Sequence, residues 1–276
     1  MVQTLGAIAI NLMKVSDENS KDQPMSIQQL QQQLDQASDR ATQAWWEAYL
    51  KHALLFRGLK LPQVRAVLHT WIKTENFLAQ SPAQQLTTAL SLIQEPWGED
   101  KLAGILILQE VLIKQKLIDW QTDLPKFAQM FDAGYIKEWN TCDWFCVKVL
   151  NPLLKQQGKP CATAIMQWCH AENLWRKRAA VVSFVNLAKH GDRNFPDFTQ
   201  QLLNTCHVVV QCPERFAQTG TGWALRELGL ADQQAVVDFI QAHSIYFSSE
   251  GLRYAVEKVP STLQTQLKHY RRQQLQ

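Results

Sequence analysis

The sequence contains no hydrophobic run long enough to cross a membrane. Its longest apolar stretch, LAGILIL at residues 102–108, is far shorter than the roughly 20 residues that a membrane-spanning helix needs. Near the start, LGAIAINLM lacks both a basic leading region and a small-residue cleavage site, which argues against a secretory signal. The sequence therefore predicts no membrane partner and a cytoplasmic location.

Closely paired cysteines are also missing. The six cysteines show neither the even spacing of a secreted disulfide framework nor a CxxC pair. Cys142 and Cys146 are four residues apart, and further possible ligands occur at Cys169-His170 and Cys206-His207-Cys212. Because zinc sites usually carry closely spaced ligand pairs, we expect no metal and interpret the cysteines as small buried apolar residues.

Charge of one sign is not in large excess. The formal net charge is +3 and the isoelectric point is near 8.5, which by itself does not demonstrate nucleic-acid binding. Local basic clusters occur at Arg176-Lys177-Arg178, at residues 148–159 and 51–65, and in LKHYRRQQ near the end. Such runs are commonly solvated helix faces.

Alternating strand patterns are absent, and from about residue 26 the chain shows amphipathic segments with apolar residues three and four apart. Proline and glycine breakers divide these segments. The sequence predicts helices at approximately residues 27–35, 39–57, 62–76, 83–94, 98–117, 123–133, 137–150, 160–171, 173–189, 196–207, 213–228, 232–243 and 248–259.

Short helices that recur as pairs every 35 to 40 residues are typical of an all-α, HEAT-like helical-repeat solenoid. Such a superhelix leaves one curved, concave face as the functional surface. We expect a mobile leader at residues 1–25, one repeat domain at 26–260 and a basic C-terminal tail at 261–276.

The candidate site begins with Trp139 and Asp143, which lie one helical turn apart and therefore share a helix face. Two further segments supply Arg178, in ENLWRKRAA, and Trp223, in QTGTGWALRELG. Two indoles, a carboxylate and a guanidinium suit a cationic guest. Each residue alone has a structural alternative, because tryptophans are usually packing residues and an aspartate can be a helix cap or a salt-bridge partner.

Several segments in the same order resemble the bacterial DNA alkylation repair family of alkylpurine DNA glycosylases. The resemblance runs from about residue 40 to 260 and is carried by EAYLKHALLFRGLKLPQVR, EWNTCDW, LWRKRAAV, GWALRE and SSEGLRYAVEKV. It implies a HEAT-like solenoid whose concave face holds duplex DNA. It also implies cleavage of the N-glycosidic bond of cationic alkylated purines such as 3-methyladenine and 7-methylguanine, with the damaged base left largely stacked.

Carried over residue by residue, the resemblance places catalytic roles on Tyr49, Trp139, Asp143 and Trp223. Arg178 is then the expected phosphate contact, and the neighbouring basic residues Arg176, Lys177, Arg226 and Lys148 are further expected DNA contacts.

The residue types fit this chemistry without a cofactor. An alkylated purine already carries the positive charge of a good leaving group, so the reaction needs stabilisation of the sugar cation rather than a general acid. An indole face attracts a cation, and Asp143 can stabilise the oxocarbenium-like centre and orient a water. Lys148 lies about 140° around the helix from Asp143, so we expect hydrolysis without a Schiff-base lyase step.

The sequence departs from the family pattern at three positions. Thr219 stands where a lysine is usual, Asn140 where an aspartate commonly follows the first tryptophan, and Gly220 adds a flexible point inside a helix at a cost of roughly 1 kcal/mol. Two alternatives therefore stay open: a catalytically silent binder of damaged or branched DNA, and a protein-binding solenoid scaffold. A monomer is expected, because a solenoid that wraps DNA needs no second subunit.

Overall fold

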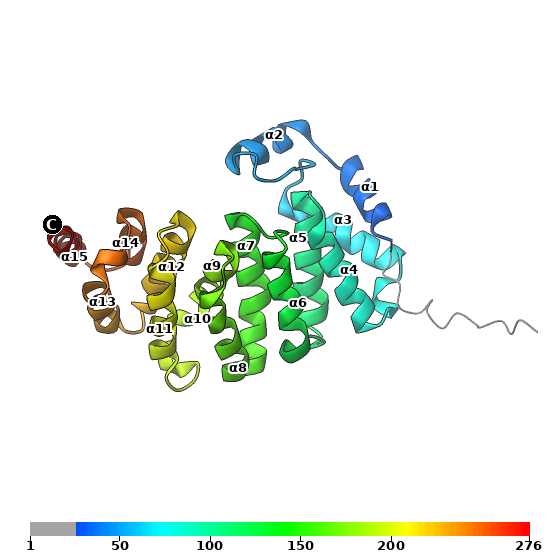
Figure 1. The fold of residues 1–276 in the computed structure, drawn as a ribbon. Helices are drawn as coiled ribbons and strands as arrows, with labels where there is room; N and C mark the ends of the chain where they lie inside the picture. The colour runs from blue at the N-terminus through cyan, green and yellow to red at the C-terminus, as the bar shows by residue number, and fades with distance from the viewer. Residues whose placement is uncertain (1–25) are drawn as a thin grey trace, which may run out of the picture.

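The computed structural model describes residues 26–276, and the described chain is built from helices (Figure 1). The predicted leader at residues 1–25, together with LGAIAINLM, lies outside the described residues. The α-helices are α1 (Gln28–Gln36), α2 (Arg40–Tyr49), α3 (Leu61–Thr74), α4 (Pro82–Gln94), α5 (Gly98–Ile107), α6 (Trp120–Asp132), α7 (Trp139–Phe145), α8 (Asn151–Met166), α9 (Leu174–Val182), α10 (Val185–Ala188), α11 (Phe198–Val210), α12 (Arg215–Leu228), α13 (Gln233–Ala242), α14 (Ser249–Ala255) and α15 (Ser261–Gln274).

From α3 to α15 the helices follow one another along a row (Figure 1). Pairs such as α4 with α5, α9 with α12 and α12 with α14 pack side by side. The main apolar core extends through these helices, from Leu30 in α1 to Leu267 in α15. The predicted all-α helical-repeat fold is confirmed.

Helix starts follow from local capping chemistry. Ser81 and Gln84 form a reciprocal capping box ahead of α4, with Pro82 in its first turn, so backbone N–H groups that no helix carbonyl can reach are satisfied. The Asp39 carboxylate accepts from Thr42 N at α2, and the Ser248 hydroxyl accepts from Gly251 N at α14. These short polar residues fix where the three helices begin.

The predicted helix at 39–57 ends early, at Tyr49. Lys51 and His52 both adopt left-handed backbone conformations, which an α-helix cannot continue through. The following loop is tied to the row of helices instead, because the buried Glu99 carboxylate accepts hydrogen bonds from the backbone N–H groups of residues 57, 58 and 59. Residues 40–60, which we call the arm, therefore stand above the row in Figure 1.

The Arg57 side chain also fixes the arm. The side chain is 5% exposed, makes an ion pair of 2.8 Å with Asp100 on α5 and contacts Asp35 on α1. Burial alone would lower the pKa of Arg57, but the two carboxylates outweigh it and raise the pKa. Removing Asp100 would leave the buried guanidinium without its buried partner, so this contact binds the arm firmly to α5.

Two other boundaries differ from prediction for identifiable reasons. Pro152 does not end the segment predicted at 137–150, because a π-helical turn at Cys146–Leu150 leads directly into α8. Pro152 lies in the first turn of α8, where proline is tolerated. The real break is Gly158, with φ +69° inside α8. Beyond residue 260, α15 packs against α13, so helical packing continues into the segment expected as a tail.

All six cysteines are free, and five of them are buried. Burial raises the pKa of the Cys161 thiol to about 12 and raises the pKa of Cys142 and Cys206 as well. These thiols are protonated at neutral pH and pack as apolar residues, as predicted from the sequence.

Lys101 is a buried cation in α5. Its ammonium group donates to the carbonyls of Ile93 (2.7 Å) and Tyr135 (2.8 Å). Burial, and then the charge of Lys137, lower its pKa from 10.5 to about 8. Between these values the unfolded chain binds more protons at Lys101 than the folded chain, so the folded state gains stability as pH rises.

We therefore expect the free energy of unfolding to contain a Lys101 contribution that grows between pH 8 and 10.5 by at most about 3 kcal/mol. The measurement is urea unfolding of the wild type and of Lys101→Met at several pH values. The difference between their free energies of unfolding isolates the Lys101 contribution, because the other titrating groups are the same in both proteins. Parallel pH profiles for the two proteins would show that Lys101 keeps its ordinary pKa.

Candidate functional site

One groove collects most of the residues expected to be functional. It has a volume of about 600 Å³ and is lined by Tyr49, Lys51, Trp139, Asp143, Arg178, Arg215, Phe216, Thr219, Trp223, Arg226 and Tyr254. These residues come from the arm and from α7, α9, α12 and α14. The structure thus brings all four expected catalytic residues together with Arg178 and Arg226.

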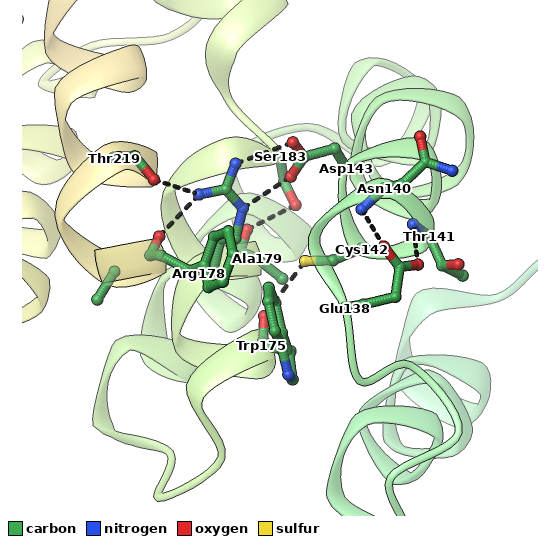
Figure 2. A network of polar contacts seen from close by, with 12 residues as sticks. Glu138, Asn140, Thr141, Cys142, Asp143, Trp175, Arg178, Ala179, Ser183 and Thr219 are labelled. Atoms are coloured by element: carbon green, nitrogen blue, oxygen red, sulfur yellow. Dashed lines mark hydrogen bonds and ion pairs between the residues drawn. The ribbon is translucent and has the colours of Figure 1, made fainter. Parts of the chain in front are cut away.

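A bidentate ion pair lies at the floor of the groove (Figure 2). Arg178 Nε and Nη2 donate to Asp143 Oδ1 and Oδ2, each at 2.8 Å. The Arg178 side chain is 6% exposed and that of Asp143 is 16% exposed. Burial would lower the pKa of Arg178, but the Asp143 charge and hydrogen bonds prevail and raise it above the ordinary value. The guanidinium therefore stays charged and fixes the plane of the carboxylate.

The remaining donors of Arg178 point to α12. Nη1 donates to the carbonyl of Phe216 at 2.7 Å and to Thr219 Oγ1 at 3.2 Å (Figure 2). This position differs from the expected phosphate contact, because the guanidinium is buried and each of its nitrogens already donates within the protein. Arg178 instead links α7, α9 and α12 through one side chain.

The unusual residues Thr219 and Gly220 explain how α12 accommodates Arg178. A Cβ atom at Gly220 would lie 3.1 Å from Arg178 Nη1 and 3.2 Å from its Cγ, closer than ordinary van der Waals contact. Thr219 supplies a hydroxyl acceptor on the same turn. Both departures from the family pattern are thus contacts to the arginine that holds Asp143.

The start of α7 positions Trp139. The Glu138 carboxylate accepts from the backbone N–H groups of Asn140 (2.5 Å) and Thr141 (2.6 Å). Burial raises the pKa of Glu138, and these hydrogen bonds oppose the shift. Asn140 lines a small apolar cavity behind α7 and not the groove, so its amide does not replace a groove carboxylate.

Aromatic rings form the arm side of the groove. The Tyr49 ring meets the Trp139 ring edge to face at 5.5 Å between centroids and stacks on Trp45 at 5.0 Å. On the α12 side, the Arg226 guanidinium lies 6.0 Å from the Trp223 ring. The groove therefore presents aromatic surface on both sides of Asp143.

Three of the expected DNA contacts do not line the groove. Arg176 pairs with Asp132 at 2.6 Å and lies over the Trp168 ring. Lys148 lies over the Trp144 ring. Lys177 is half-buried near Cys169. Burial raises the pKa of the Cys169 thiol, and the positive charge of Lys177 opposes that shift. The basic cluster of the sequence is thus divided among different sides of α9.

Four groove residues were not predicted from the sequence: Lys51, Arg215, Phe216 and Tyr254. For Phe216 a signal existed. Phe216, Thr219, Trp223 and Arg226 are spaced by three, four and three residues, which places them on one face of α12. Lys51 follows α2 in a left-handed conformation, so helical periodicity could not have found it.

The described residues, 26 to 276, include no group of three or more His, Cys, Asp or Glu side chains placed to hold a metal ion. Within that same range, none of the helices has the length and apolar character required to span a membrane.

The fold and the groove define an all-α helical-repeat protein with an aromatic, charge-paired groove. The family model for DNA alkylation repair enzymes matches residues 30–259, and the chain belongs to that family. Its fold is similar to a structure described as a predicted DNA alkylation repair enzyme from Enterococcus faecalis, with a TM-score of 0.65, 18% sequence identity, and coverage of 81% of this chain and 97% of the other. No curated protein sequence matches the chain.

The close contact between Gly220 and Arg178 predicts that a Gly→Ala substitution, which usually stabilises a helix, destabilises this one. In an open helix, Gly→Ala stabilises by about 1 kcal/mol, but at Gly220 the new methyl group presses on Arg178, which four hydrogen bonds hold in place. We expect Gly220→Ala to lower the free energy of unfolding by about 1 kcal/mol, measured by urea denaturation.

Gly229 at the end of α12 is the matched control. It has φ −59° and its nearest Cβ contact would be an ordinary 3.5 Å, so Gly229→Ala should be neutral or stabilising by up to about 1 kcal/mol. Equal effects at the two glycines would show that Arg178 yields easily and is not firmly held.

Proposed function

We propose that this protein hydrolyses the N-glycosidic bond of cationic alkylated purines, such as 3-methyladenine and 7-methylguanine, in duplex DNA. It acts as a monomer, without a metal or organic cofactor, through a HEAT-like concave face and with the damaged base left stacked. The observation that carries the proposal is Asp143, held by Arg178 in a groove with aromatic surface on both sides. Family membership supports DNA repair as the setting.

The groove suits the charge that moves during such a reaction. A cationic purine leaves as a neutral base, and positive charge develops on the deoxyribose. The faces of Trp139 and Trp223 attract that charge, each contact contributing roughly 0.5 to 2 kcal/mol. Asp143 adds an ionised oxygen pair aimed at the same space, and a fixed charge stabilises a developing opposite charge without reorganising.

Arg178 determines which way the carboxylate faces. Each Asp143 oxygen accepts one hydrogen bond from Arg178, and a carboxylate oxygen has a second lone pair for another partner. The free lone pairs can orient a water toward the sugar carbon. Arg178 is thus a positioning residue for Asp143, in place of the phosphate contact expected from the sequence.

The same ion pair favours a second candidate, a binder of damaged DNA that releases no base. The guanidinium neutralises part of the charge that would stabilise a sugar cation, and Asp143 is only 16% exposed. Base release from methylated duplex DNA by the wild-type protein distinguishes the two candidates.

The carboxylate test is Asp143→Asn, which keeps the shape but removes the negative charge. We expect release of 7-methylguanine from duplex DNA, measured under single-turnover conditions, to fall by about a hundredfold or more. Because the change also removes the partner of a buried guanidinium, thermal unfolding and duplex affinity are measured beside it to show that the variant keeps its groove. The control Asp132→Asn makes the same chemical change at the Arg176 pair outside the groove and should leave release intact. Full activity of Asp143→Asn would remove the carboxylate from the mechanism.

Lys51 allows a second test, because it is the one lysine among the groove residues of the described chain. Hydrolysis by water leaves an abasic site and no covalent enzyme–DNA bond, whereas a lyase forms a Schiff base. We expect no borohydride-trapped adduct between the protein and its methylated substrate. An adduct that disappears in Lys51→Ala would show that the lysine attacks the sugar and that the enzyme is bifunctional.

A further inference from the structure

The groove has four lining cations among the described residues, and two of them are mostly buried within internal ion pairs. Arg178 is buried with Asp143. The Arg226 side chain is 19% exposed and pairs with Glu227 at 2.9 Å and with Glu257 at 2.5 Å. This leaves Lys51, which is exposed on the arm, and Arg215, whose side chain is 60% exposed at the start of α12.

The Arg215 guanidinium holds a carboxylate in the geometry that a phosphate would take. Nε donates to Glu250 Oε2 at 2.7 Å and Nη2 donates to Glu250 Oε1 at 2.8 Å. Two parallel hydrogen bonds from one edge of a guanidinium are the arrangement that arginine also uses for phosphate oxygens. Both partners are partly exposed, so a competing anion can reach them.

Helix stability does not explain an arginine at this position. Arg215 is the first residue of α12, where the positive end of the helix dipole disfavours a cation. Its guanidinium lies 5.3 Å from the Phe216 ring, and Phe216 packs on Trp175 at 4.8 Å between centroids. The cation is thus supported by a fixed aromatic ring at the edge of the groove, which suits binding of an anion from outside.

We propose that Arg215 is the phosphate-contacting residue of the groove and that Glu250 occupies it in the free protein, so that DNA binding exchanges a carboxylate for a backbone phosphate. The inference rests on the proposed function only in taking duplex DNA as the ligand. An exposed ion pair is weak, and displacing Glu250 therefore reduces affinity by no more than about fivefold.

The test is the affinity of the full chain for an unmodified duplex, measured by fluorescence anisotropy over a range of salt concentrations. Arg215→Ala should weaken binding and reduce the log–log salt slope by about 0.9, the value for one phosphate contact. Glu250→Gln should tighten binding by about two- to fivefold. In the double variant Arg215→Ala/Glu250→Gln the gain from Glu250→Gln should vanish, because its effect passes through Arg215.

Arg253→Ala is the matched control, since Arg253 is 64% exposed and contacts the same Glu250 at 3.5 Å but does not line the groove. It should leave the slope unchanged. An unchanged slope in Arg215→Ala, or an equal gain from Glu250→Gln with and without Arg215, overturns the exchange. Absence of duplex binding by the wild type would instead overturn the proposed function, so the two failures are distinguishable. Thermal unfolding of each variant confirms that it is folded.

Discussion

The buried pair of Arg178 and Asp143 is the interaction on which the groove depends. Taking two charges out of water is costly, and the pair is stable only because α12 supplies two further acceptors to the guanidinium. Three helices that are far apart in sequence must therefore keep one relative position. Arg178 orients the carboxylate, and the packing of α7, α9 and α12 holds Arg178 in place.

Glycines at close approaches make this packing possible. Within α12, Gly220 leaves space for Arg178, and Gly222 allows the backbone of α14 to come so near that a Cβ would lie 2.4 Å from the Gly251 carbonyl oxygen. Gly220 and Gly222, two positions apart, thus determine how closely α9 and α14 pack against α12. A helix with side chains at both positions would keep its secondary structure and lose the groove, since α9 and α14 would move outward.

Much of the fold and part of the groove could be predicted because helical periodicity is local. Trp139 with Asp143, and Trp223 with Arg226, share helix faces that spacing alone reveals. The partner of Arg178 is 35 residues away and depends on how α7 and α9 pack, which spacing does not encode. Consecutive residues on a helix differ by about 100°, so Arg176, Lys177 and Arg178 look like one cluster in sequence but face three directions. The end of α2 was missed because two consecutive non-glycine residues adopt left-handed conformations.

The arm has its own small apolar cluster, formed by Leu50, Leu54 and Phe56 with Trp46 and Trp139, separate from the core of the helix row. Elements with few shared contacts form separate cooperative units and can open at a lower free energy than the whole molecule. Trp139, from α7, packs against this cluster and against Tyr49. The same indole therefore lines the groove and forms part of the contact between the arm and the helix row. Because Glu99 and Arg57 hold residues 57–59 against α5, local opening would involve only residues 40–56. It would widen the groove from the side while the rest of the chain stays folded, so a long polymer could enter without being threaded through.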